Sequence, residues 1–271
     1  MKIELLAAGW CRHPECVVMR GGSWRPLEMP AGVALIEHPR LGIGLFDAGY
    51  SQRFIEATRP FPQRLYRWVT PPSLPAGSTA AAQLSARGIS PSQVRWIVLS
   101  HLHADHVAGV LDFPAARLFV HGAALRAMRR RDCWENLLHG VLPALLPDDL
   151  DARTTVLEAG DFALVGPGDL PAHDLAGDGT LLIIPLPGHA AGQIGLQIAP
   201  RDAQPLFLIA DAAWSSRALA SDGHGPSRLA DLICESSRTA TLTLNRLRRL
   251  RAAAPELRMV PSHCPACWPR R

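Results

Sequence analysis

Short apolar runs recur along the whole chain, separated by glycine, proline and charged residues. Each run is three to six residues long, which suits a β-strand better than a helix. The first three runs are separated by turns that contain glycine or proline, and they predict an antiparallel meander. The predicted strands are residues 3–8, 33–37, 41–46, 96–99, 118–120, 154–157, 181–186, 194–198, 206–209 and 258–260.

Three segments have helical patterns instead. Residues 79–87 are Ala-rich and stop at Gly88, and residues 133–145 repeat apolar side chains at helical spacing until Pro143 ends or kinks the helix. Residues 242–250 carry a row of arginines, for which a solvated helix face is the simplest interpretation and nucleic acid a second one. Ten strands with a few helices between them predict two sheets with helices outside, an α/β layered sandwich.

The composition narrows the class of protein. Of 271 residues, 48% are hydrophobic and 19% are charged, which excludes disorder and fibrous repeats. Lys2 is the only lysine, and a net charge of +4 is too small to argue for nucleic acid or a membrane as partner. Six scattered cysteines, no signal-peptide pattern and no apolar stretch of membrane-spanning length predict a soluble cytoplasmic protein.

Four potential metal ligands follow the predicted strand at 96–99 within six residues. They are His101, His103, Asp105 and His106, and such a cluster is hard to explain as packing. Imidazole and carboxylate bind zinc, iron and manganese, and a turn can aim residues one or two apart at neighbouring ions. Histidines and an acid on a solvated loop are the weaker interpretation.

Three further ligand-type residues each follow a predicted strand. They are His189, Asp211 and His263. Alone, each would be interpreted as a turn residue, but loops from different strands can converge at one edge of a sandwich. Together with the cluster they predict one shared metal site.

With this His-x-His-x-Asp-His motif and the later ligands, the chain resembles the metallo-β-lactamase-fold hydrolase superfamily. The match covers nearly the whole chain, because residues 46–49 resemble the family's early Asp-Gly turn and residues 187–193 its second histidine motif. The resemblance implies a single domain over residues 1–271 with the family's α/β fold, a four-layer αβ/βα sandwich. The bridging carboxylate expected at Asp211 places the chain beside the glyoxalase-II-like and lactonase-like branches rather than the true β-lactamases.

The resemblance also implies a dinuclear site with two divalent metal ions, zinc first and iron or manganese as alternatives. Asp47 would support a ligand rather than bind an ion. By position, the first ion would be held by His101, His103 and His189, the second by Asp105, His106 and His263, and both would be bridged by Asp211.

Such a site implies a metal-dependent hydrolase that acts on an ester, thioester or lactone carbonyl of a small molecule. Two cations can lower the pKa of a shared water to roughly 7 and polarise the carbonyl. Asp105 would orient the attacking water and carry a proton to the leaving group.

Loop residues are the candidates for substrate binding. Residues 51–75, rich in aromatics and arginines, are expected to form a flap over the metals, with Tyr66 and Trp68 contacting substrate. Residues 122–146 are expected to form a helical insertion.

Trp214 stands three residues after Asp211, where the lactonases that the chain resembles carry a tyrosine whose hydroxyl assists the substrate carbonyl. An indole has one N–H donor and no hydroxyl. This departure favours an apolar acyl thioester or ester over a small homoserine lactone, and core packing of Trp214 is an equal alternative.

Three alternatives stay open. A mononuclear-iron oxidoreductase similar to persulfide dioxygenases shares most of the ligands, and a nuclease is disfavoured because the chain lacks room for the extra domain typical of that branch. The third is a non-catalytic metal-binding accessory protein of a biosynthetic pathway. A homodimer is left open, as is a redox role for Cys264 and Cys267, whose simplest interpretation is two buried small side chains.

Overall fold

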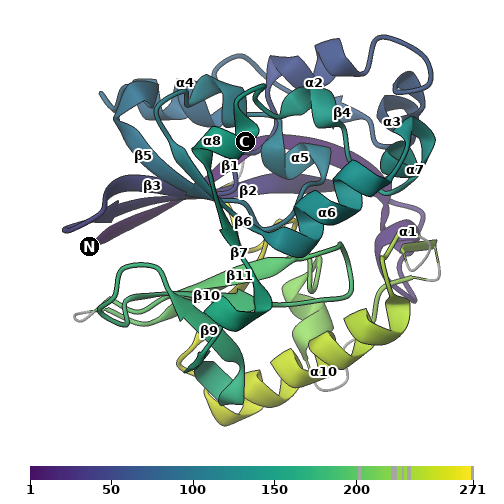
Figure 1. Cartoon of the computed structure of the whole chain (residues 1–271). Helices are drawn as coiled ribbons and strands as arrows, with labels where there is room; N and C mark the ends of the chain where they lie inside the picture. The colour runs from purple at the N-terminus through teal and green to yellow at the C-terminus, as the bar shows by residue number, and fades with distance from the viewer. Residues whose placement is uncertain (201–202, 221–224, 228, 231–232, 270–271) are drawn as a thin grey trace.

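Two β-sheets stacked face to face form the centre of the protein, with helices on their outer faces (Figure 1). The computed structural model describes residues 1–200, 203–220, 225–227, 229–230 and 233–269. Among these residues no helix combines the length and apolar character needed to cross a membrane.

The first sheet contains seven of the described strands. Its β1–β2–β3 part is antiparallel, which confirms the predicted meander, and both β1 and β2 extend well beyond their apolar runs. From β3 onward the neighbours are parallel. The strand order is β4 (Pro72–Ser73), β1 (Lys2–Pro14), β2 (Pro26–His38), β3 (Gly42–Phe46), β5 (Val94–Val98), β6 (Arg117–His121) and β7 (Thr154–Leu157).

The second sheet contains six described strands. Its inner strands are antiparallel, and β12 and β13 at one edge are parallel. The order is β13 (Arg258–Pro261), β12 (Leu206–Ala210), β11 (Ile194–Ile198), β10 (Leu181–Pro185), β9 (Pro171–Asp174) and β8 (Leu164–Val165).

Helices cover the outer face of each sheet. In Figure 1, α10 lies along the outer face of the second sheet, while α2 and α4 lie on the outer side of the first. Short 3-10 turns occupy residues 91–93, 110–112, 143–145, 159–161, 167–169 and 216–219. The α-helices are α1 (Glu15–Val18), α2 (Gln52–Ala57), α3 (Arg64–Val69), α4 (Ala80–Ser85), α5 (Ala104–Val107), α6 (Gly122–Arg130), α7 (Cys133–Leu138), α8 (Leu150–Arg153) and α10 (Ser237–Ala253).

Three apolar cores separate the layers, because alternate side chains of each strand point to opposite faces of its sheet. In β12, Leu206 and Leu208 face the first sheet, while Phe207 and Ile209 pack under α10. Strands covered on both faces are apolar at nearly every position, as their sequences predict. The αβ/βα four-layer sandwich is therefore confirmed.

The predicted helix at 133–145 is too long. The structure ends α7 at Leu138, and Gly140 then adopts φ +67°, a backbone conformation that a helix cannot contain. Pro143 begins a separate 3-10 turn. The apolar repeat continued past the break because Val141 and Leu142 are buried as loop residues.

All the predicted metal ligands follow carboxyl ends of strands. The strands β3 and β5 are parallel, and so are β12 and β13, so each pair delivers its following loop to one edge. The strand β10 points the same way as β12, because each is antiparallel to β11. The stacked sheets thus bring five loops to a common edge.

Candidate metal centre

The His101–His106 cluster is buried directly after β5. His101 and His103 lie in an extended loop, while Asp105 and His106 belong to the single turn of α5. A loop followed by one helical turn points these side chains in different directions, so they can serve two ions. The backbone N–H of Ala104 donates to Gly140 O at 3.0 Å, which anchors the start of this turn.

The other three candidates arrive from the second sheet and complete two groups of donors. All seven side chains are buried, and the ligand atoms within each group lie within 4.8 Å of one another. Each group contains the three residues expected to hold one ion, and Asp211, expected to bridge both ions, belongs to the first group. One contains His101, His103, His189 and Asp211, and the other contains Asp105, His106 and His263.

Asp211 faces both groups. Its Oδ2 lies 3.3 Å from His189 Nε2 and 3.1 Å from His263 Nε2, and its Oδ1 lies 3.5 Å from His106 Nε2. Asp105 Oδ2 is 3.3 Å from His263 Nε2.

Several of these atoms have no hydrogen-bond partner among the described residues. Buried orphans include His101 Nε2, His106 Nε2 and Asp211 Oδ1, which all point into the cluster. Since a buried polar atom without a partner is costly, this donor set fits two cations with imidazole and carboxylate ligands.

Asp47 supports the cluster from behind. Its carboxylate accepts hydrogen bonds from Ser100 N at 2.7 Å, Ser100 Oγ at 2.8 Å and His106 Nδ1 at 2.7 Å. Because the Ser100 hydroxyl donates to Asp47, its oxygen can accept from His101 Nδ1 at 3.0 Å. These bonds leave the Nε2 atoms of His101 and His106 as the free ligand atoms.

The remaining histidines are oriented in different ways. His263 Nδ1 donates to Pro30 O at 2.8 Å, and His189 Nδ1 lies 3.9 Å from Cys234 Sγ. His103 is the exception, because its Nδ1 faces His189 Nε2 at 3.2 Å. We therefore expect His103 to bind through Nδ1 and the other four through Nε2.

Burial and charge divide the histidines into two kinds. Burial lowers the pKa of His101, His103 and His189, so these imidazoles are neutral and have a lone pair available. Burial also disfavours the charged forms of His106 and His263, but neighbouring carboxylates outweigh it and raise both pKa values. Burial opposes ionisation of Asp211, yet His263 and His106 hold its pKa well below the usual value.

Unusual backbone conformations lie beside the centre. Asp47 and Ala210 have φ of +60° and +48°, although neither is glycine. Gly188, directly before His189, has φ +131°, and a Cβ there would lie 2.2 Å from the Ala240 backbone nitrogen in α10. Strained positions of this kind cluster at functional sites.

A cavity of about 500 Å³ opens over both donor groups. His103, Asp105, His189, Asp211 and His263 line its floor. Its walls are mainly apolar and come from β1, α1, α3, α7 and the residues Leu229, Ala230 and Ile233. This is the size and character of a small-molecule site.

Two of the three predicted substrate residues line this cavity. Tyr66 and Trp214 are both part of its wall. Trp68 is not, because α3 turns Leu65, Tyr66 and Val69 inward and leaves the Trp68 side chain 67% exposed. The prediction for Trp68 is therefore wrong, and the wall instead contains Trp134 of α7.

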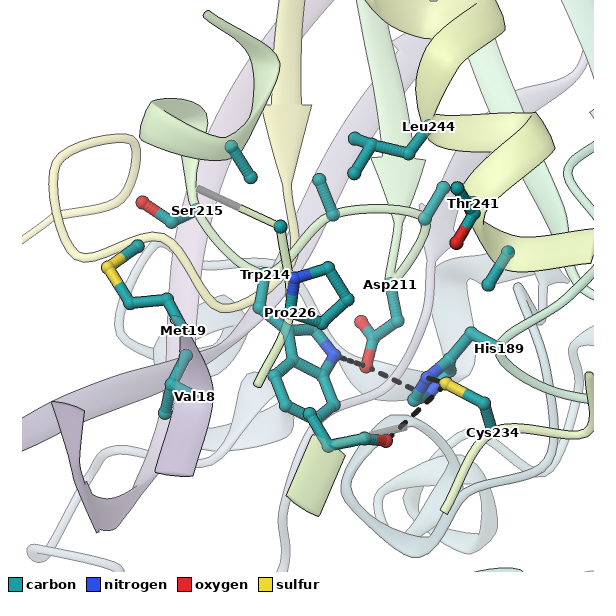
Figure 2. Close-up of a pocket in the computed structure, with 16 residues that line it drawn as sticks. Val18, Met19, His189, Asp211, Trp214, Ser215, Pro226, Cys234, Thr241 and Leu244 are labelled. Atoms are coloured by element: carbon teal, nitrogen blue, oxygen red, sulfur yellow. Dashed lines mark hydrogen bonds and ion pairs between the residues drawn. The ribbon is translucent and has the colours of Figure 1, made fainter. Parts of the chain in front are cut away.

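Trp214 is tied to the centre rather than free to meet a substrate carbonyl. Its Nε1–H donates to Asp211 Oδ2 at 2.9 Å, and its ring lies 5.6 Å from that of His189 (Figure 2). Figure 2 also shows Cys234 beside His189.

Sequence reasoning missed the wall residues from β1. Cys11 and His13 line the cavity, but their strand was expected to end at residue 8. No signal in the pattern marks them, since Cys11, Arg12 and His13 lack apolar alternation. Burial raises the pKa of the Cys11 thiol, so it stays protonated.

Cys264 and Cys267 lie behind the ligand His263. Cys264 is buried and its Sγ accepts from Ser216 N at 3.3 Å, while Cys267 packs against the core between the sheets. Both are free thiols.

Fold and site together define the class of protein. It is a four-layer αβ/βα sandwich with a buried His/Asp site that is suited to two metal ions. The site lies at the edge where strands of both sheets end. The profile of the Metallo-beta-lactamase superfamily matches residues 33–263, and the chain belongs to this family.

The similar proteins include several lactonases. The chain is 28% identical over 264 residues to "N-acyl homoserine lactonase AttM" of Rhizobium johnstonii, covering 93% of this chain and 88% of the relative. A solved structure of a B. thuringiensis AiiA mutant with N-decanoyl-L-homoserine bound has a TM-score of 0.70 at 18% identity, covering 98% and 94% of the two chains. AidC, described as a dizinc quorum-quenching lactonase, has a TM-score of 0.63 at 17% identity, covering 97% and 87%.

Proposed function

We propose that this protein is a metal-dependent hydrolase that opens the ring of a lactone carrying an apolar acyl chain, with N-acyl homoserine lactones as the substrate class. One observation carries the proposal: seven buried His and Asp ligands lie at the floor of an apolar cavity of about 500 Å³. A lactone carbonyl can lie at this floor while an acyl chain lies along the wall.

The relatives support this choice. One relative that aligns over 93% of this chain is named an N-acyl homoserine lactonase, and the AiiA mutant structure holds N-decanoyl-L-homoserine at its active site. We therefore place lactones ahead of the thioesters that the sequence favoured. Trp214 no longer favours a thioester over a lactone, because its indole N–H donates a hydrogen bond to Asp211.

Two divalent cations, zinc before iron or manganese, are the proposed cofactors. When bound, they would acidify a water molecule and polarise the substrate carbonyl. The chain's own contribution is positional: Asp211 faces both donor groups, and Asp105 belongs to the second group and also lines the cavity. The Asp105 carboxylate is thus placed to orient the attacking water and to carry its proton to the leaving alkoxide.

The test is a comparison of specificity constants for metal-reconstituted protein on a ladder of N-acyl homoserine lactones and a matched ladder of acyl thioesters. We expect chelator-sensitive lactone turnover and a KM that falls with each added methylene, at about 0.8 kcal/mol per buried group. A tenfold preference for thioesters would contradict the lactone assignment. Oxygen uptake on a persulfide, with one iron per chain, would instead establish the oxidoreductase alternative.

Asp105→Ala tests the residue role within the same experiment. We expect kcat to fall at least ~100-fold, the lower end for a positioned acid or base. Metal content is measured in parallel, and Asp151→Ala, an exposed ion-pair partner of Arg129, is the control. Unchanged turnover in a fully metallated Asp105→Ala variant would remove the role.

A further inference from the structure

The chain has two tyrosines, and one of them borders the metal centre. Tyr66, in the middle of α3, is part of the cavity wall beside the floor residues His103 and Asp105. Tyr50 is fully buried, and it is not among the residues that line the cavity. The two tyrosines therefore lie in different environments: Tyr66 in the cavity wall and Tyr50 in the core.

Packing fixes the ring of Tyr66. It meets Phe54 edge to face at a centroid distance of 5.5 Å, and Phe54 meets Tyr50 in the same way at 5.0 Å. Edge-to-face contacts of this kind hold aromatic rings in defined orientations. The hydroxyl position of Tyr66 is thus set by a row of three rings.

Gly140 shows where that hydroxyl lies. A Cβ on Gly140 would be 3.4 Å from Tyr66 Oη and 3.2 Å from His103 Cδ2. The Tyr66 hydroxyl oxygen and the ring of His103, a predicted metal ligand, therefore both lie close to the Cβ position of Gly140. Absence of a side chain at residue 140 leaves room between them.

Among the described residues, the Tyr66 O–H donates to no acceptor. The backbone N–H of Ala104 approaches the phenol oxygen but already donates to Gly140 O at 3.0 Å. An N–H can only give a proton to the phenol oxygen, so the O–H remains able to donate elsewhere.

A donor is needed at this floor because Trp214 does not provide one. Its single N–H is bound to Asp211 Oδ2, and it has no hydroxyl. Hydrolysis places negative charge on the substrate carbonyl oxygen, and a preorganised donor there is worth a large part of the rate. Among the described lining residues, Thr70 at the end of α3 has the other hydroxyl.

We propose that the Tyr66 hydroxyl donates a hydrogen bond to the substrate carbonyl oxygen as charge develops there. This rests on the proposed hydrolytic function. The chain thereby supplies from α3 the hydroxyl that is absent at position 214.

Tyr66→Phe removes the hydroxyl and keeps the ring. We expect kcat on an N-acyl homoserine lactone to fall about 100-fold, the lower end for loss of one such donor. KM, its dependence on acyl length, the metal content and the Tm should stay close to the parent values, because the wall is unchanged. Tyr50→Phe is the matched control and should keep full turnover, since the Tyr50 hydroxyl is buried and Tyr50 does not line the cavity.

The outcomes separate the two proposals. If the parent protein hydrolyses lactones and Tyr66→Phe does so equally well, the role of Tyr66 is wrong and the function stands. If Thr70→Val shows the kcat loss instead, the donor is Thr70. If the metallated parent hydrolyses no ester, thioester or lactone, both proposals fall.

Discussion

Asp47 shows how one buried carboxylate can organise a metal centre without binding the ion. It accepts three hydrogen bonds from Ser100 and His106, and through Ser100 it also reaches His101. Its φ of +60° keeps the carboxylate turned toward them. One residue therefore orients a ligand in each donor group.

We expect Asp47→Asn to weaken metal binding about 10- to 100-fold, the usual effect of losing such a supporting residue. An amide keeps the shape but brings its own N–H donors to a position that must accept three bonds. Competition with a chromophoric chelator measures the change. Asp112→Asn, which removes a charge at the surface pair with Arg53, should leave the affinity unaltered.

Metal binding should release protons from the donor groups. Carboxylates raise the pKa of His106 and His263 above the usual histidine value, so both histidines keep their proton to a higher pH than an ordinary histidine does. That proton must leave before the lone pair can bind, and metal affinity therefore falls as pH falls. Calorimetry in buffers of different ionisation enthalpy counts the protons, and binding without proton release would contradict this assignment.

The seven residues of the two donor groups could be singled out from sequence because they follow apolar runs, where chain direction and burial are well defined. Which nitrogen of His103 faces the site could not, since the approach of His189 decides it. Trp68 was misassigned because a six-residue helix has too few turns for the pattern to show which face is buried. Cys11 and His13 were missed because their strand has no alternation.

At the scale of elements, the loop after β10 is fixed by close packing against α10. Gly188 O accepts from Ser236 N at 2.9 Å, and His189 O accepts from Glu235 N at 2.9 Å. The helix is thus attached to the backbone on both sides of the Gly188–His189 peptide. The position of this ligand depends on the contact between loop and helix.

Gly188→Ala should therefore destabilise the fold by about 1–3 kcal/mol, the usual cost of overpacking. It should also lower the metal content, since the new Cβ would displace either the loop or Ala240. Gly177→Ala is the control, because Gly177 also has positive φ but nothing within 4 Å of its Cβ position. Equal metal content and equal Tm in the two variants would refute the argument.

Strands were easier to predict than their ends. Apolar runs located the central strands because these strands are covered on both faces, but β1 and β2 continue as a paired ribbon through polar residues. Pairing between β1 and β2, not burial of apolar side chains, holds these extended parts of the strands together. The short strands β8 and β9 were missed for the same reason, since the edge strand β8 exposes both Leu164 and Val165 and its neighbour β9 buries only Ala172.

At the scale of the whole molecule, the metal centre joins the two sheets. His101 to His106 follow a strand of the first sheet, and the other ligands follow strands of the second. Direct bonds across the junction include Ile194 N to Ser100 O at 2.8 Å and Gly32 N to Ser262 O at 3.1 Å. Bound ions would add a second connection between the halves.

Removing the metals should therefore lower stability and not activity alone. Ligand that binds only the folded state stabilises it by about 2.7 kcal/mol at a free concentration of 100 times Kd. For a chain of this length, the Tm should fall by roughly 5–10 °C after chelation and recover on adding zinc. Calorimetric scans with and without chelator test this, and an unchanged Tm would show that the ions do not connect the sheets.

The long strand β1 also separates the protein's only side-chain amine from its chemistry. Lys2 pairs with Glu37 at 3.1 Å, and 69% of the Lys2 side chain is exposed. The first residue of β1 that lines the cavity is Cys11, ~30 Å further along the strand. Coupling to an amine-reactive resin should thus attach every molecule by the end remote from the cavity and leave substrate access free. Thiol coupling reaches the exposed Cys133 beside the wall residue Trp134, and an enzyme immobilised that way should lose turnover that the amine-coupled form retains.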